Sequence, residues 1–209
     1  MKESYIFRSC LTSDVSRLNS LKSVLDELKL PYSPGDRIGI KLHWGEIGNK
    51  NYLPPIYAKE IVGWLKTKKL KPFVFDTTVL YSGGRREGRQ SLITAAKHNY
   101  SEEYLQCPVV IGDGLDGKDV IDLSACYKHF EQVQVGKVIN QAEGFVVLSH
   151  FKGHMETGFG AAIKNISMGF ASRAQKQRIH ADAKPLLNKE KCILCGECVK
   201  VCPVGAAAM

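Results

Sequence analysis

The sequence predicts an α/β protein, with a mostly parallel sheet and covering helices, followed by a small and incomplete C-terminal ferredoxin-like module. Three observations lead to this prediction. Segments with helical periodicity alternate with short apolar runs, polar residues follow several of those runs, and four closely spaced cysteines lie near the C-terminus. Repeated alternation of helix and strand is typical of parallel crossover units. We therefore expect an α/β domain over 1–184 and a ferredoxin-like module over 185–209.

The first half of the chain supplies two helices and two strands. Over 13–30, apolar residues recur at three- and four-residue intervals, which predicts an amphipathic helix. The segment 36–42 is typical of a strand. A second helix is predicted over 54–70, because its two opening prolines suit a first helical turn. It leads into the apolar strand 73–75.

The second half continues the alternation. A short helix is predicted over 89–98, and a strand over 109–111 that runs into a glycine-rich turn. A helix around 135–141 and a clean apolar strand over 145–148 follow. A last helix is expected over 161–168, after a glycine-rich loop. The polar and basic segment that comes next, residues 173–184, is interpreted as a surface segment or linker.

The formal net charge of +8 is dispersed along the chain, and its densest groups are the lysines of 66–71 and the arginines of 85–89. Lysines at the end of a helix complement its dipole, so we interpret the first group as a solvated helix terminus. The second group follows a glycine pair, and an exposed loop is favoured there over an anion-binding loop. No nucleic-acid partner is expected.

The sequence predicts a cytoplasmic protein without membrane contact. No stretch approaches the about 20 apolar residues that a membrane-spanning helix needs, and the N-terminal residues lack the apolar core of a secretory signal. A reducing compartment disfavours disulfides. The seven cysteines are therefore expected to bind metal or to be buried as thiols.

Four cysteines form a complete C-x2-C-x2-C-x3-C-P run, namely Cys192, Cys195, Cys198 and Cys202, followed by Pro203. This is the spacing with which bacterial ferredoxins hold a [4Fe–4S] cluster. Structural zinc is the competing interpretation, but zinc sites usually place two C-x2-C pairs on separate knuckles with a longer spacer. The quartet therefore predicts a [4Fe–4S] cluster.

The quartet stands alone, although in two-cluster ferredoxins the fourth cysteine of such a run ligates the other cluster. Three explanations stay open: the chain is a fragment, the quartet holds one cluster unaided, or Cys10, Cys107 or Cys126 supplies a ligand. We favour the fragment, in which the cluster is expected to be absent or labile. The three isolated cysteines are otherwise interpreted as buried or half-buried thiols.

Polar side chains that follow the predicted strands suggest a second site, because active sites of open α/β sheets collect at the carboxyl ends of strands. The candidate catalytic residues are His43, Asp76, His150, His154 and Lys164, with Glu46 and Asn165 nearby. Imidazoles with a carboxylate can bind a divalent metal or perform acid–base chemistry, but no diagnostic zinc spacing is present. The alternative is that these side chains only cap loops.

The chain resembles the DUF362 family, an uncharacterised group of iron–sulfur-associated proteins. The resemblance rests on the segments 41–46, 149–154 and 158–165 and on the cysteine run, and it covers most of the chain. It implies an α/β domain interrupted by a two-cluster ferredoxin insert, with more α/β sequence after the insert. This chain departs from that pattern, since the second quartet and the later segment are missing.

Together these features predict an iron–sulfur protein with an electron-transfer or redox role, and an oxidoreductase is one outcome. In this hypothesis the cysteine module exchanges electrons with the site near His43, His150 and His154. The expected partners are a redox protein or a small anionic substrate. Two other functions stay open: non-redox binding with a structural cluster, and metal-dependent catalysis at the histidines.

Overall fold

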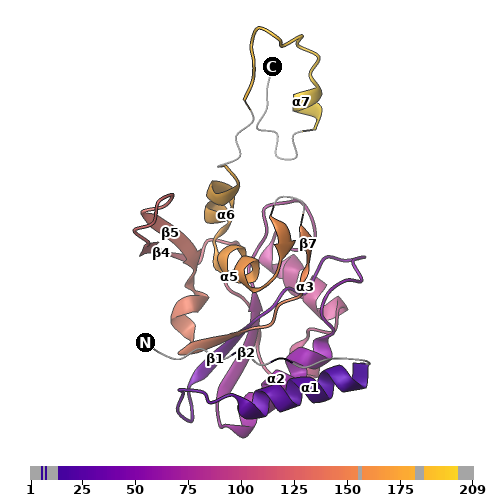
Figure 1. Ribbon diagram of the computed structural model, residues 1–209, viewed down its shortest axis with the longest axis vertical. Coiled ribbons are helices and arrows are strands. Elements are labelled where there is room, and N and C mark those ends of the chain that lie inside the picture. The colour runs from indigo at the N-terminus through magenta and orange to yellow at the C-terminus, as the bar shows by residue number, and fades with distance from the viewer. Residues whose placement is uncertain (1–5, 7, 9–13, 155–156, 182–185, 202–209) are drawn as a thin grey trace.

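The computed structural model describes residues 6, 8, 14–154, 157–181 and 186–201 (Figure 1). At its centre lies a four-stranded parallel sheet with the strand order β3-β2-β1-β6. The strands are β1 (Arg37–Lys41), β2 (Lys71–Asp76), β3 (Val109–Ile111) and β6 (Gly144–Val147). The predicted α/β class and its parallel sheet are confirmed.

The chain builds this sheet in two directions from β1. It first adds β2 and β3 on one side, and later returns to add β6 on the other side. Ile40 of β1 is consequently paired with Val74 of β2 and with Val146 of β6. In open α/β sheets, such a reversal leaves a crevice beyond the carboxyl ends of the strands, and ligands bind there.

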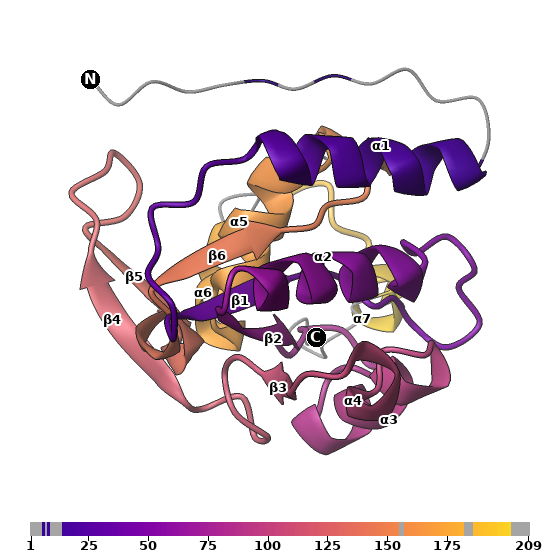
Figure 2. The ribbon, with the colours of Figure 1, turned by 90° about the horizontal axis from the view of Figure 1, so that it is seen from below.

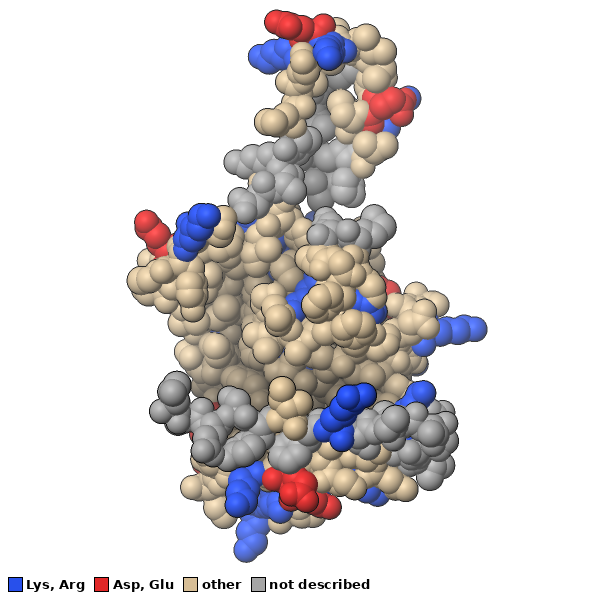
Figure 3. All heavy atoms as spheres, viewed as in Figure 1, with Lys and Arg blue, Asp and Glu red and all other residues tan. Residues whose placement is uncertain are grey.

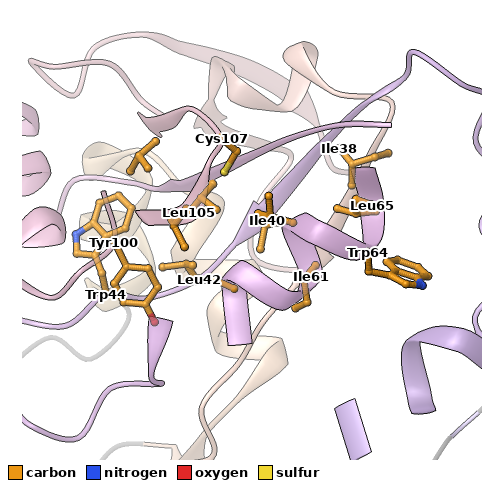
Figure 4. Packing of buried hydrophobic residues seen from close by; sticks show 14 of the residues in the cluster. Ile38, Ile40, Leu42, Trp44, Ile61, Trp64, Leu65, Tyr100, Leu105 and Cys107 are labelled. Atoms are coloured by element: carbon orange, nitrogen blue, oxygen red, sulfur yellow. The ribbon is translucent and has the colours of Figure 1, made fainter. Parts of the chain in front are cut away.

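One face of the sheet is covered by α1 (Asp14–Glu27) and α2 (Pro55–Thr67), as Figure 2 shows. Ile38 and Ile40 lie two residues apart in β1, so both side chains point to this face. Ile61 of α2 packs in the same cluster (Figure 4). All three are buried. Full burial of each aliphatic side chain stabilises the fold by about 1.5–3 kcal/mol.

Aromatic rings fill the other face, beneath α5 (Ala162–Phe170). The ring of Phe170 meets Phe75 and Phe145 edge to face, with centroids 5.2 and 5.1 Å apart. Gly39 of β1 makes room for this layer, because a Cβ there would lie 2.7 Å from the Phe145 ring. Strand β1 therefore carries no side chain beneath this aromatic layer.

Smaller elements complete the fold around the sheet. They are α3 (Gly88–Lys97), α4 (Glu102–Leu105), α6 (Arg173–His180), α7 (Glu197–Lys200), the 3-10 helix η1 (Lys137–Gln141), the hairpin β4–β5 (Val120–Ser124 and Gln132–Gly136) and the hairpin β7–β8 (Lys152–His154 and Gly158–Gly160). The predicted helices over 13–30, 54–70, 89–98 and 161–168 correspond to α1, α2, α3 and α5. The first predicted residue, Ser13, lies outside the described residues.

The helix predicted over 135–141 is wrong in its first part. Val135 and Gly136 end β5, which pairs with β4 in an antiparallel hairpin, and only Lys137–Gln141 are helical, as η1. Gln and Val alternate over 132–135, and this period of two suits a strand. The hairpin partner, β4, was missed because its sequence mixes apolar and acidic residues over only five positions.

The segment 173–184, predicted as a surface segment or linker, forms α6 over its first eight residues. Ser172 caps this helix by accepting a hydrogen bond from the backbone N–H of Gln175. Hydrophobic periodicity could not reveal the helix, because the side chains that it buries, Gln175 and Lys176, are polar. Residues 182–184, and with them the predicted domain boundary between 184 and 185, lie outside the described residues.

Charge is distributed over the surface as separate groups. On the face shown in Figure 3, lysines and arginines form no continuous basic stripe. Lys66, Lys68 and Lys69 are exposed at the end of α2 and just beyond it, as the prediction of a solvated helix terminus requires, whereas the exposed Lys71 begins β2. Within the described part of the chain, no helix has the length and apolar character required to cross a membrane.

Candidate functional site

A cavity of about 490 Å³ lies at the carboxyl edge of the sheet. Its walls come from the ends of β1, β2 and β6 and from β7, β8, α5 and α6. All five candidate residues predicted from the sequence line it, namely His43, Asp76, His150, His154 and Lys164. Glu46 and Asn165 line it as well. Side chains spread over more than a hundred positions of the sequence thus meet at the topological crevice.

Asp76 is the electrostatic centre of the cavity floor. Its Oδ1 accepts hydrogen bonds from the Lys41 ammonium at 2.9 Å and from the Thr77 backbone N–H at 2.8 Å. Its Oδ2 accepts one from the Arg85 guanidinium at 2.7 Å. Asp76, Lys41 and Arg85 are all buried, so the carboxylate joins two cations that water does not reach.

These contacts keep Asp76 ionised. Burial by itself raises the pKa of the carboxyl group, but the charges of Lys41 and Arg85 outweigh it and hold the pKa of Asp76 well below its usual range. Burial lowers the pKa of Lys41, and the same carboxylate opposes that shift. Because its lone pairs are used by these donors, Asp76 acts as an anchor for cations rather than as a free base.

His43 lies at the edge of this cluster, with its Nδ1 3.8 Å from Oδ2 of Asp76. Burial and then the charge of Arg85 lower the pKa of His43 below its usual value of 6.5, and Asp76 only partly opposes them. The imidazole is therefore neutral at physiological pH. A neutral ring can both donate and accept a hydrogen bond at the cavity surface.

Two atoms of the cavity lining have hydrogen-bonding capacity to spare. The Nε of Arg85 and the Oε1 of Glu46 are buried, and neither has a hydrogen-bond partner among the described residues. Buried polar atoms are nearly always hydrogen-bonded in folded proteins. Such unpaired polar atoms beside a cavity are expected where a bound ligand or an ordered water molecule completes their hydrogen bonds.

Lys41 and Arg85 are site residues that the sequence patterns did not identify. The loop 85–89 was predicted as exposed, yet the Arg85 side chain is 3% exposed, because its guanidinium turns inward to Asp76. The signal for Lys41 was a lysine at the end of β1, directly after the apolar Ile40, where side chains of a parallel strand covered on both faces are mostly buried.

Lys176 is a third buried cation that sequence reasoning missed. Its ammonium donates to Thr77 Oγ1 at 2.7 Å and to the Thr78 carbonyl at 2.5 Å. Burial lowers the pKa of Lys176 to about 8, against the raising effect of Asp113. Asp113 in turn holds Thr78 through the backbone N–H and the hydroxyl. This lysine reaches the cavity from α6, the element predicted to be a linker.

The wall formed by β6, β7, β8, α5 and α6 is rich in cations and imidazoles. It carries His150, Lys152, His154, Lys164 and His180, and we call it the histidine–lysine wall. The ammonium of Lys164 contacts Nε2 of His154 within hydrogen-bonding distance. None of the residues of this wall is acidic, whereas the cluster around Asp76 contains both cavity carboxylates.

The position of Lys41 depends on a glycine of α5. Its ammonium also donates to Asn165 Oδ1 at 2.8 Å, and Gly169 leaves the space that its side chain occupies. A Cβ at Gly169 would lie 2.6 Å from Cε and 2.7 Å from Nζ of Lys41. Three hydrogen bonds hold that ammonium, so it has little freedom to move away.

Gly169→Ala is therefore expected to destabilise the fold by about 1–3 kcal/mol, as overpacking does elsewhere. Urea unfolding followed by circular dichroism measures the change. Gly63→Ala in α2 is the matched control, because no atom lies within 4 Å of its Cβ position and alanine favours a helix over glycine by about 1 kcal/mol. Equal stability of Gly169→Ala and the wild type would contradict the tight packing around Lys41.

A second cavity, of about 450 Å³, lies beside the first. Arg17 of α1 and the stretch 50–54 line it, together with Tyr57 and Leu148. His150 lines both cavities. A single imidazole thus forms part of the boundary between a cationic space and a space bordered by tyrosines.

The cysteine segment lies apart from this site (Figure 1). Cys192, Cys195 and Cys198 are exposed thiols, and Cys202 lies outside the described residues. Within the described residues, no three His, Cys, Asp or Glu side chains are gathered closely enough to hold a metal ion. The donor type fits iron, since thiolates are the ligands of iron–sulfur clusters.

The backbone of this segment adds a second point of fit. Leu194 and Gly196 both have positive φ, at 54° and 74°. Left-handed residues of this kind occur in the backbone nests that surround anions at many iron–sulfur sites. A leucine in this region is strained, and such strain is found mainly at functional sites. The loop between the cysteines therefore has the conformation that a bound anionic cluster would stabilise.

The isolated cysteines behave differently from one another. Cys107 is buried, as predicted, and burial raises the pKa of its thiol to about 11. Cys126 is exposed, so the prediction of burial is wrong for this residue, which lies at the end of the protruding β4 strand. Cys10 lies outside the described residues. The buried, protonated thiol of Cys107 is unsuited to metal ligation.

Comparison with known families gives one match. Residues 38–198 match a family model with the description "Domain of unknown function (DUF362)". The match begins in β1 and extends through Cys198, so it includes both the cavity and three of the four quartet cysteines. No curated protein and no solved structure matches the chain.

Proposed function

The chain belongs to the DUF362 family, and from that premise we propose that it is a redox protein whose cysteine quartet holds a [4Fe–4S] cluster and whose cavity binds a small anionic substrate. The match supports treating the two parts as one functional unit, because it includes both. A family of unknown function gives no reaction, so the proposal rests on the residues of this chain.

The charge of the cavity is the observation that carries the proposal. Among the described residues, five lysine and arginine side chains and four of the six histidines of the chain line it, against two carboxylates. Asp76 and Glu46 are both close to Arg85, at 2.7 and 3.7 Å, so the excess positive charge falls on the histidine–lysine wall. In a recessed, partly enclosed space these charges attract anions more strongly than on a flat surface.

The residues of the chain have distinct roles in this proposal. Asp76 fixes Lys41 and Arg85, while Lys152 and Lys164 bind the anion. When bound, the cluster would supply one-electron exchange with a redox partner protein. The pair formed by Lys164 and His154 can hand a proton to the bound molecule for each electron that the molecule gains, and take it back in the reverse direction.

A divalent metal at the histidines is the alternative function, and the same charges oppose it. His43 has Arg85, Lys152 and Lys41 as its cationic neighbours. A divalent cation would be repelled by all three and attracted by one carboxylate that already has two cationic partners. An anionic ligand would instead be attracted by the three cations and repelled by the one carboxylate.

Anaerobic reconstitution of the full chain with iron and sulfide tests the cluster. Iron and sulfide are supplied in excess because a lone quartet is expected to hold its cluster weakly. Under these conditions we expect about four irons and four sulfides per chain and a signal in electron paramagnetic resonance after reduction. Zinc at one equivalent, or a colourless protein that retains no iron, would remove the redox proposal.

Titration with inorganic phosphate tests the anion site. Lys152→Ala is expected to weaken phosphate binding roughly tenfold, the effect of losing one charge-assisted hydrogen bond worth about 1.5 kcal/mol. Lys128→Ala is the matched control, since Lys128 is an exposed lysine of the hairpin region outside the cavity. Calorimetry gives both affinities. Equal weakening by the two substitutions would show that phosphate responds only to net charge.

A further inference from the structure

The segment that forms much of the histidine–lysine wall also carries exposed apolar side chains. Phe151, Phe159, Ile163 and Ile166 are 70%, 54%, 80% and 49% exposed, and we call them the outer apolar face. The rings of Phe151 and Phe159 stack with their centroids 5.5 Å apart. Grouped exposed apolar side chains of this size usually mark an interaction surface.

This face and the cavity share their supporting elements. β7, β8 and α5 contribute Lys152, His154 and Lys164 to the cavity, while Phe159 and Ile163 of β8 and α5 belong to the outer face. Whatever binds the outer apolar face is therefore separated from the cavity only by this thin layer. Since electron transfer falls steeply with distance, a redox group docked here would be well placed.

The cysteine segment carries a second exposed apolar surface. Ile193, Leu194 and Val201 are 84%, 74% and 73% exposed, and Leu186 and Leu187 are 97% and 67% exposed. Ile193 and Leu194 lie between two cysteines of the quartet. In Figure 1 the segment stands beyond α6, away from the sheet. Two apolar surfaces in one chain thus lack a covering partner within the described residues.

The length of the connection allows these surfaces to meet. α6 ends at His180, which lines the cavity, and Cys192 follows twelve residues later. A chain of that length spans up to about 40 Å when extended. A tether of this length raises the effective concentration of the segment at the wall to roughly the millimolar range.

We infer that the cysteine segment, when loaded with its cluster, docks through Ile193 and Leu194 onto the outer apolar face and places the cluster against the histidine–lysine wall. This inference rests on the proposed function. Charge agrees with it, because a cluster ligated by four thiolates is net negative, and the described residues of the wall include lysines but no carboxylate. The occupant is the segment of the same chain, and a second copy or a separate protein is excluded by the experiment below.

Methyl-labelled nuclear magnetic resonance of the full chain tests the docking. The isoleucine δ1-methyl signals of the chain are recorded before and after anaerobic cluster reconstitution and reduction, because the cluster is paramagnetic in its ground state once it is reduced. Paramagnetic broadening of Ile193 reports that the cluster is bound beside it. Broadening of Ile163 and Ile166, with Ile56 of α2 unaffected, is the expected result. Ile56 is a suitable control because it is 37% exposed on the opposite side of the sheet.

Every other outcome contradicts the docking, and each one identifies which part of the proposal fails. Broadening confined to Ile193 shows a bound cluster without docking, so the proposed function survives and the docking fails. No broadening anywhere shows that the cluster itself is absent, and both fail. A mixture of labelled Cys198→Ser chain and unlabelled loaded chain reports contact between copies. Broadening of Ile163 in that mixture assigns the face to a second copy.

Substitution of the docking surface provides the second measurement. Phe159→Asp, chosen because it leaves both reporting isoleucines in place, is expected to reduce the broadening of Ile163 roughly tenfold, since it replaces an apolar ring of the docking surface with a charged side chain. Tyr127→Asp is the matched control, as Tyr127 is 77% exposed outside both surfaces. Iron content and the broadening of Ile193 verify that both variants are loaded. Unchanged broadening of Ile163 in Phe159→Asp would refute the docking surface.

Discussion

Replacement of Asp76 by alanine is expected to lower the free energy of unfolding by about 3–5 kcal/mol, the cost of leaving buried cations without their counter-ion. Asp76 is 2% exposed and receives hydrogen bonds from both Lys41 and Arg85. Neither cation can reach water without moving strand β1 or the loop that carries Arg85. Urea unfolding of the two proteins measures the difference.

Asp26→Ala is the control, because Asp26 is an exposed acid of α1, where substitutions change stability by about 0.5 kcal/mol or less. A similar loss in both variants would mean that Asp76 is not a structural centre. The dependence on pH adds a second criterion. Since the native-state pKa of Asp76 is depressed, its stabilisation is complete above about pH 4 and is lost only as the pH falls through the native-state value.

Cys198→Ser is expected to abolish retention of the cluster, because it removes the third of four consecutive thiolate ligands. The fold of the α/β domain should be unaffected, since the segment stands apart from the sheet. Iron and sulfide analysis after anaerobic reconstitution gives the first result, and circular dichroism the second. Cys126→Ser is the matched control, as Cys126 is another exposed thiol but lies outside the quartet.

If Cys126→Ser lost its iron as completely as Cys198→Ser, Cys126 would be a ligand of the cluster, and the quartet alone would not account for iron binding. Retention of four irons by Cys198→Ser would be equally damaging, because another ligand would then have to complete the site. Together, these two serine variants test both the spacing argument and the open question of a remote cysteine ligand.

Much of the fold could be predicted, since the elements that form the sheet obey simple patterns. The apolar runs 73–75, 109–111 and 145–148 all became parallel strands. The hairpin β4–β5 and the helix α6 could not be found in the same way. Their stability comes from cross-strand pairing and from the burial of polar side chains such as Gln175, which a hydrophobicity pattern does not register.

The site could be predicted in outline for a topological reason. His43, Asp76 and His150 follow three strands that turned out to be parallel neighbours, so their carboxyl ends meet at one edge. The charged residues at the floor of the cavity were harder to predict from the sequence. Arg85 looked like a loop residue because its burial depends on Asp76, nine positions earlier in the sequence, and pairing of this kind has no periodic signature.

His150 borders both cavities, so ligands in the two spaces would be thermodynamically coupled wherever each requires its own orientation of this imidazole. A molecule bound on either side of the imidazole would fix its rotamer and its tautomer for the other side. Linkage requires that such an influence be mutual. If one ligand changes the affinity for the other by some factor, the second ligand changes the affinity for the first by the same factor. Communication between neighbouring compartments would then need no movement of the backbone, only the reorientation of one ring.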